Sequence, residues 1–255
     1  MSAPASPAAP TLRITILGAG DAFCSGGHSN AAYLFEAKTA TFLVDCGPTV
    51  LLSMKRGQID TASLDFAVVS HLHGDHFGGL PFLLLEYTYE RPRDRPFLIV
   101  GPPGIEGRLW ELYRALYRDV TDTVLPFELR FLELEPETPA PLGGVEIFPV
   151  RVPHQVEDTA LALRFDVAGR RVLYSGDTPW IDRLGELARG VDLFLCECSG
   201  FADAKGRHVE YGTFRKLASG LGCHRLVLVH LGSEMRKRAA EIDLECASEG
   251  MVIEL

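Results

Sequence analysis

The chain has 255 residues, of which 47% are hydrophobic and 23% charged. This is the composition of an ordinary globular protein and excludes disorder for most of the chain. Asp and Glu number 34 against 25 Lys and Arg, a net charge of -9, which excludes the overall basic field that holds long nucleic acid. No run of 18 apolar residues occurs, so we expect neither a membrane span nor a membrane partner.

The first ten residues are rich in Ala, Pro and Ser and lack the basic and apolar regions of a signal peptide. We expect a disordered tail over 1–10 and one hydrolase domain over 11–255. Six cysteines are scattered without a Cys-x-x-Cys pair, which favours reduced thiols and a cytoplasmic location. Cys196 and Cys198 are expected to be inert thiols in the core.

Strand-like and helix-like runs alternate along the chain. The patterns predict strands over 12–17, 31–36, 40–45, 65–70, 97–100, 127–135, 144–152, 159–167, 171–175, 192–196, 226–229 and near Val252. Helices are predicted over 49–56, 79–88, 105–117, 181–188, 211–219 and 234–246. Ala168-Gly169 is the clearest tight turn. With no flexible linker and no repeat, the order predicts one α/β domain with two sheets.

A glycine-rich turn follows the first predicted strand as Gly18-Ala19-Gly20. A dinucleotide-binding loop would need Gly or Ala where this chain has Phe23, so we interpret the segment as a sharp turn.

The strongest chemical signal is the run His71-Leu72-His73-Gly74-Asp75-His76, directly after a predicted buried strand. His71 and His73 are two residues apart, so both imidazoles leave the same face. Gly74 would permit a tight reversal that places Asp75 and His76 on a loop entering the next helix. Imidazole and carboxylate together suit Zn²⁺, with Mn²⁺ or iron as alternatives.

Three further residues end apolar strands, where their side chains can reach a common crevice: His154, Asp177 and His230. Each alone is typical of an ordinary edge residue. Together with the cluster they make seven candidate ligands, which is enough for two divalent ions bridged by a carboxylate.

This pattern resembles the metallo-β-lactamase superfamily, which implies a four-layer αββα sandwich with the metal site at its edge. The resemblance implies His71, His73 and His154 on one ion, Asp75, His76 and His230 on the other, and Asp177 between them. Cys196-Glu197-Cys198-Ser199 followed by Arg207-His208 is similar to the ribonuclease Z and related phosphodiesterase branch. There the Glu orients a His that donates a proton, a role implied here for Glu197 and His208. A homodimer is expected on the same ground.

Two features depart from that branch. Glu210 stands where the branch has a small hydroxyl residue, and Asp177 comes only 23 positions after His154, too few for the basic arm that grips tRNA. We therefore expect phosphodiester chemistry without tRNA processing.

The sequence predicts a dinuclear metal-dependent hydrolase, a phosphodiesterase for a small or cyclic nucleotide-like anion. Metal-activated water would attack, Asp75 would orient or deprotonate that water, and His208 would protonate the leaving group. Hydrolysis of a lactone, thioester or carboxylic ester is the alternative, and a catalytically silent, metal-stabilised binding module is a third. An iron-based reductase is disfavoured because it has a carboxylate in place of His73.

Other features are expected to have lesser roles. His28 is interpreted as a solvated loop residue and His224 as structural. The loops over 91–95, 120–126 and 200–208 are expected to shape the pocket, and the basic residues of 91–95 could meet a charged substrate.

Overall fold

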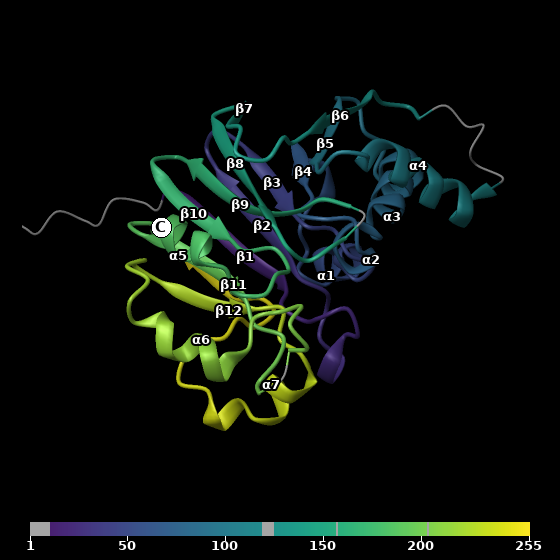
Figure 1. Cartoon of the computed structure of the whole chain (residues 1–255). Helices are drawn as coiled ribbons and strands as arrows, with labels where there is room; N and C mark the ends of the chain where they lie inside the picture. Colours follow the sequence, from purple (N-terminus) through teal and green to yellow (C-terminus); the bar gives the residue numbers. More distant parts are fainter. Residues whose placement is uncertain (1–10, 119–124, 157, 203) are drawn as a thin grey trace, which may run out of the picture.

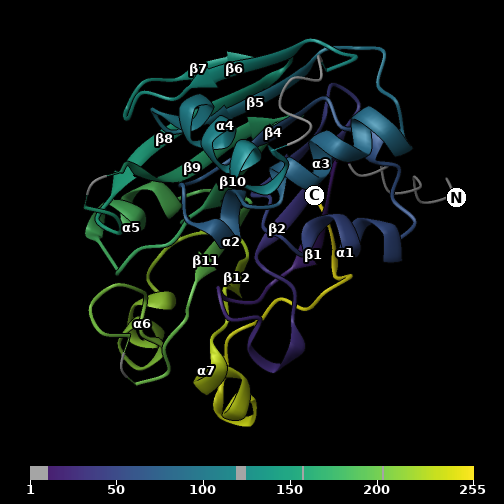
Figure 2. The same ribbon diagram turned by 90° about the vertical axis from the view of Figure 1, so that its right-hand side faces the viewer.

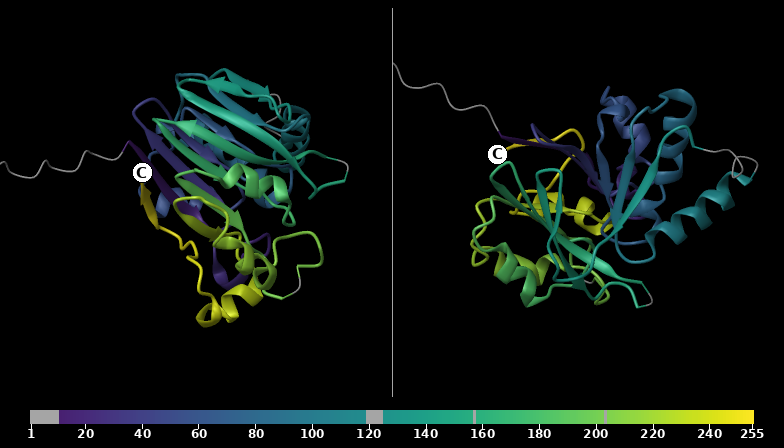
Figure 3. Two further views of the ribbon diagram at one scale, coloured as in Figure 1. Left: turned by 60° about the vertical axis from the view of Figure 1, so that its left-hand side comes forward. Right: turned by 90° about the horizontal axis from the view of Figure 1, so that it is seen from above.

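The computed structural model describes residues 11–118, 125–156, 158–202 and 204–255. The tail predicted over 1–10, and most of the loop predicted over 120–126, lie outside the described residues. Two β-sheets stack face to face and helices cover both outer faces (Figures 1 and 3). The predicted four-layer αββα sandwich is confirmed.

The first sheet combines an antiparallel meander with parallel strands. Its order is β13-β1-β2-β3-β4-β5-β6. A short turn joins β2 to β3, a longer loop joins β1 to β2, and helical crossovers make β3 to β6 parallel. The strands are β1 (Leu12–Gly18), β2 (Ala32–Ala37), β3 (Thr41–Val44), β4 (Phe66–Val68), β5 (Phe97–Gly101), β6 (Leu129–Glu133) and β13 (Val252–Glu254).

The second sheet has the order β12-β11-β10-β9-β8-β7. Ala168 and Gly169 have φ values of 51° and 77°, so the predicted tight turn does join β9 to β10. The three-residue edge strand β7 was not predicted, because it is short and contains a proline. The strands are β7 (Ala140–Leu142), β8 (Val145–Val152), β9 (Ala160–Val167), β10 (Arg170–Tyr174), β11 (Leu193–Glu197) and β12 (Leu226–Val229).

Helices from the first half of the chain cover the first sheet (Figure 2), and those from the second half cover the second sheet. The first group is α1 (Val50–Arg56), α2 (Gly74–Phe77), α3 (Leu80–Leu85) with its π-helical continuation η3 (Glu86–Glu90), and α4 (Ile105–Leu116). The second group is α5 (Asp182–Ala188), α6 (Tyr211–Ala218) and α7 (Ser233–Lys237). No helix in the described ranges is long and apolar enough to cross a membrane.

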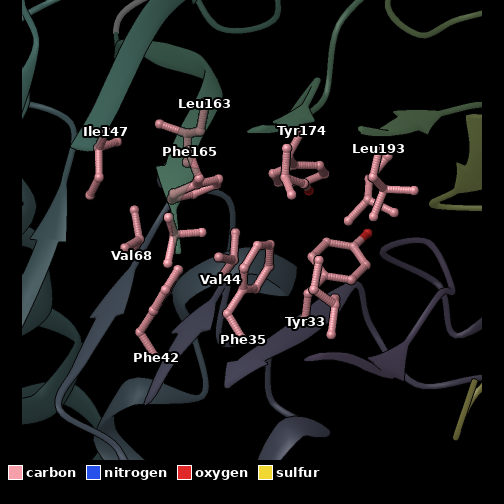
Figure 4. Packing of buried hydrophobic residues seen from close by; sticks show 14 of the residues in the cluster. Tyr33, Phe35, Phe42, Val44, Val68, Ile147, Leu163, Phe165, Tyr174 and Leu193 are labelled. Atoms are coloured by element: carbon pink, nitrogen blue, oxygen red, sulfur yellow. The ribbon is translucent and has the colours of Figure 1, made fainter. Parts of the chain in front are cut away.

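Three hydrophobic clusters fill the three spaces between the four layers. Alternating residues of one strand enter different clusters: Tyr33 and Phe35 of β2 face the other sheet, whereas Leu34 faces the helices. Between the sheets, Phe42 stacks on Phe35 with centroids 4.8 Å apart (Figure 4). This central layer holds the two sheets in one relative position. It therefore also fixes the relative positions of the side chains that the two sheets contribute to the site.

The helix predicted over 234–246 is wrong beyond its first turns. Helix α7 ends at Lys237, and a 3₁₀ turn over Ala239–Glu241 follows. The chain then runs beside β12, where Leu228 N donates to Glu245 O and Ala247 N donates to Leu228 O. Hydrogen bonding to this sheet edge outweighs the local helical pattern. The terminal strand near Val252 is confirmed and pairs with β1.

Candidate metal centre

Both sheets contribute side chains to one edge of the sandwich, in each case from the carboxyl end of a strand. His71 and His73 follow β4, His154 follows β8, Asp177 follows β10 and His230 follows β12. Leu161 N donates to Ser70 O, so the backbone joins the two sheets next to His71. All seven candidate ligands predicted from the sequence meet here.

Asp75 and His76 lie in the single turn of helix α2, not on a loop as predicted. His73 N-caps this turn with extended backbone, and the His73 carbonyl accepts from His76 N. The tight reversal predicted at Gly74 is not needed here: an added Cβ would meet nothing within 4 Å, so the position does not require glycine. The helical turn brings both side chains toward the second sheet.

Three imidazoles form the first cluster. His73 Nδ1 lies 3.1 Å from His71 Nε2 and 3.1 Å from His154 Nε2. Burial lowers the pKa of His71 well below its ordinary value and lowers that of His154 to about 4. Neutral imidazoles whose nitrogens converge in this way are suited to a divalent cation.

The second cluster contains Asp75, His76, Asp177 and His230. Asp177 Oδ2 lies 3.2 Å from His230 Nε2, 3.4 Å from His76 Nε2 and 3.8 Å from His154 Nε2. Its carboxylate therefore stands between the two clusters, in the position that a bridging ligand requires.

Asp45, which the sequence analysis missed, supports this centre from behind. It directly follows β3, is fully buried and has a φ of 60°. Its carboxylate accepts from Ser70 N at 2.7 Å, Ser70 Oγ at 2.9 Å and Tyr174 Oη at 2.8 Å. His76 Nδ1 lies 2.7 Å from Asp45 Oδ2, so His76 Nε2 is aimed at the centre.

The electrostatics of the centre fit divalent metal ions. Asp45 and Asp177 are buried, and their ion pairs in the described part of the chain are with histidines only. Buried carboxylates without a Lys or Arg partner favour a bound cation. Among the described residues, the buried atoms His76 Nε2 and Asp177 Oδ1 also make no hydrogen bond. The donor set is therefore able to bind divalent metal ions.

His208 and Glu197 form a pair at the rim of the centre. His208 Nδ1 lies 2.8 Å from Glu197 Oε1, and the His208 side chain is 24% exposed whereas Glu197 is fully buried. Glu197 also accepts from Thr178 N at 2.8 Å. Burial lowers the pKa of His208, but the hydrogen bond and charge of Glu197 outweigh it, so the pKa is raised. His208 also falls within ligand distance of His154 and Asp177.

The basic loop over 91–95 does not shape this centre, contrary to expectation. Arg91 pairs with Asp60 at 2.8 Å, and Arg95 pairs with Asp65. Arg93 is 4% exposed and donates to the carbonyls of Leu64 and Pro96. Each of these arginines bonds to an acceptor close to the loop, so their side chains stabilise the loop.

Cys196 and Cys198 are buried as expected, and burial raises the pKa of both thiols. Thiols that stay protonated and out of solvent are inert.

Comparison with known proteins agrees with this fold and centre. The uncharacterized protein Rv1339 of Mycobacterium tuberculosis is 33% identical over 228 residues, covering 87% of this chain and 81% of the relative. Ribonuclease Z of Methanosarcina acetivorans is 28% identical over 272 residues, covering 87% and 88%.

Two solved structures share the fold. The metallo-β-lactamase fold protein YhfI of Bacillus subtilis has a TM-score of 0.76 at 24% identity, covering 95% of this chain and 99% of that one. Human tRNase Z, short form, has a TM-score of 0.75 at 22% identity, covering 95% and 98%.

Fold and centre together define a hydrolase of the metallo-β-lactamase superfamily, in its ribonuclease Z-like branch. Within that branch, the profile described as Anti-Pycsar protein Apyc1 matches residues 12–247. The chain belongs to this family.

Proposed function

We propose that this protein is a dinuclear metal-dependent phosphodiesterase that acts on a small or cyclic nucleotide-like phosphodiester. The observation that carries the proposal is the pair formed by His208 and Glu197, 2.8 Å apart at the rim of the centre. A phosphodiester has a poor alkoxide leaving group and gains most from a positioned proton donor. The relationship to ribonuclease Z, a nuclease by name, supports the same chemistry.

The seven ligands divide as the geometry suggests. His71, His73 and His154 would hold one ion, and Asp75, His76 and His230 the other, with Asp177 shared. When bound, two divalent ions, Zn²⁺ by preference, would activate water and neutralise the phosphoryl oxygens.

Two side chains of the protein, Asp75 and His208, accept and donate the protons. Asp75 orients the attacking water and accepts its proton as the new P–O bond forms. His208 gives its proton to the leaving alkoxide as the old P–O bond breaks, and Glu197 holds the imidazole in place and in its protonated form. Since Nδ1 is bonded to Glu197, Nε2 is the nitrogen that faces the substrate.

Hydrolysis of a lactone, thioester or carboxylic ester is the second candidate, because the same seven ligands serve it. Carbonyl chemistry has less need of a positioned proton donor, so it leaves the buried Glu197 unexplained.

A substrate panel separates these candidates. The metal-loaded protein is assayed with bis(4-nitrophenyl) phosphate, a lactone and a thioester, each before and after chelation. We expect the largest kcat/KM for the diester and its loss on chelation. A larger kcat/KM for the lactone or thioester would contradict the proposal, and no hydrolysis with two metals bound would indicate a silent binding module.

A further inference from the structure

Phe23 is an aromatic side chain held out in solvent. It is 86% exposed and lies in the loop between β1 and β2. A large exposed aromatic ring has an unfavourable contact with water, which a bound ligand would remove.

The loop that carries Phe23 is well fixed. Asp21 is 4% exposed, and its carboxylate accepts from Phe23 N at 3.2 Å, Ser25 N at 2.9 Å and Ser25 Oγ at 2.8 Å. Arg236 of α7 donates to Ala19 O at 3.1 Å. The ring is thus presented on an ordered backbone, which lowers the entropy lost when a ligand binds.

The same loop runs next to the centre. Leu231 N donates to Ala19 O at 2.9 Å, and Gly20 forms a bridge with Leu231, the residue after the candidate ligand His230. On the other side lies Ser199, whose backbone N donates to Glu197 Oε2 at 3.2 Å. The loop that carries Phe23 is therefore tied to the segment of His230, and Ser199, which lines the same cavity as Phe23, is bonded to Glu197 of the proton-donor pair.

A cavity of about 550 Å³ opens between these segments. Its lining combines the Phe23 ring with serine hydroxyls, glycine backbone and the charged side chains of Asp21, Lys205 and Glu234. Its volume lies in the range of small-molecule sites. An aromatic face beside groups that donate and accept hydrogen bonds matches a planar, hydrogen-bonding heterocycle.

We propose that this cavity is the subsite for the nucleobase of the substrate and that Phe23 is its stacking platform. The inference rests on the proposed phosphodiesterase function: the phosphate is placed at the metal centre and the base extends over Phe23. Stacking on a phenyl ring accepts any base, because every base has a π-face.

Matched substrates test the subsite. Thymidine 5′-(4-nitrophenyl phosphate) and methyl 4-nitrophenyl phosphate share a leaving group and differ in the nucleoside. For Phe23→Ala we expect kcat/KM to fall about tenfold with the thymidine ester, mainly through KM, and to stay unchanged with the methyl ester. Phe23→Tyr should restore the value, and Tyr89→Ala, which removes another exposed aromatic ring, should change neither.

A binding measurement separates this inference from the proposed function. Calorimetry with the metal-loaded protein should show tighter binding of thymidine 5′-monophosphate than of ribose 5-phosphate, with the difference lost in Phe23→Ala. If the wild type hydrolyses neither diester, the proposed function fails while this comparison still tests the subsite. The subsite would be overturned if Phe23→Ala changed the affinities of both ligands equally or changed neither. It would also be overturned if the substitution changed the oligomeric state and left thymidine 5′-monophosphate binding unchanged, a result that would assign Phe23 to a protein interface.

Discussion

Asp45 shows how a residue outside the candidate ligand set can control it. One carboxylate receives a backbone amide, two hydroxyls and the Nδ1 side of His76, all without exposure to solvent. Its backbone is left-handed, and its side chain reaches Ser70, just after β4. Such a partner fixes both the ring orientation and the basicity of a ligand imidazole.

Replacing Asp45 by Asn should therefore weaken metal binding at the His76 cluster, by roughly 10- to 100-fold. Competition with a chromophoric chelator measures the affinity of each ion. Asp60→Asn is the matched control, because Asp60 pairs with Arg91 at the surface. Equal affinities in Asp45→Asn and the wild type would show that His76 needs no such support.

His208 can be tested as a proton donor by removing it. His208→Ala should lower kcat for the diester by about 10²- to 10⁴-fold while both metals remain bound. Metal content by mass spectrometry and kcat are measured on the same sample. Loss of metal would instead make His208 a ligand, a role that its position near His154 and Asp177 would allow.

The sequence alone predicted much of this site, because each of the seven candidate ligands lies within three residues of the end of an apolar strand or sits in the run from His71 to His76. The structure brings all seven together. Asp45 was missed because a single Asp after a strand has no spacing pattern, and its three partners, Ser70, His76 and Tyr174, lie far from it in the sequence. The position of Phe23 near His230 also depends on tertiary contacts that no local pattern encodes.

At the scale of elements, short apolar runs bounded by turn residues predicted most strands well, since central strands such as β4 and β11 are buried on both faces. Prediction failed where tertiary contacts decide. The segment from Ile242 to Ala247 has helical composition but bonds to the edge of β12, and Asp75 and His76 form a helical turn of only four residues.

The junction between the β3–α1 turn and helix α2 offers an element-scale test. A Cβ on Gly47 would lie 2.1 Å from Asp75 O, so only glycine lets the two backbones approach. Gly47→Ala should destabilise the protein by about 1–3 kcal/mol and lower metal affinity by displacing Asp75. Urea unfolding and metal titration measure the two effects.

Gly107→Ala is the control for that change. Position 107 lies inside α4, and an added Cβ would meet nothing within 4 Å, so alanine should be neutral or stabilising by up to about 1 kcal/mol. Equal effects of the two substitutions would contradict the role assigned to close approach at Gly47.

For the whole molecule, the net charge of -9 and the proposed anionic substrate are compatible. The seven ligands include two carboxylates, and two divalent cations there would leave a positive centre, which acts more strongly on a nearby phosphate than a distant surface does. Since the ligands come from both sheets, the sandwich must be assembled before the centre exists. Metal binding is therefore a property of the complete fold.

Metal titration of the chelator-stripped protein tests the central claim most directly. Zn²⁺ is added in fractions of an equivalent while hydrolysis of bis(4-nitrophenyl) phosphate is followed. The account predicts that activity is absent at first and reaches its maximum at two equivalents per chain. Full activity without metal, or a maximum at one equivalent, would contradict it.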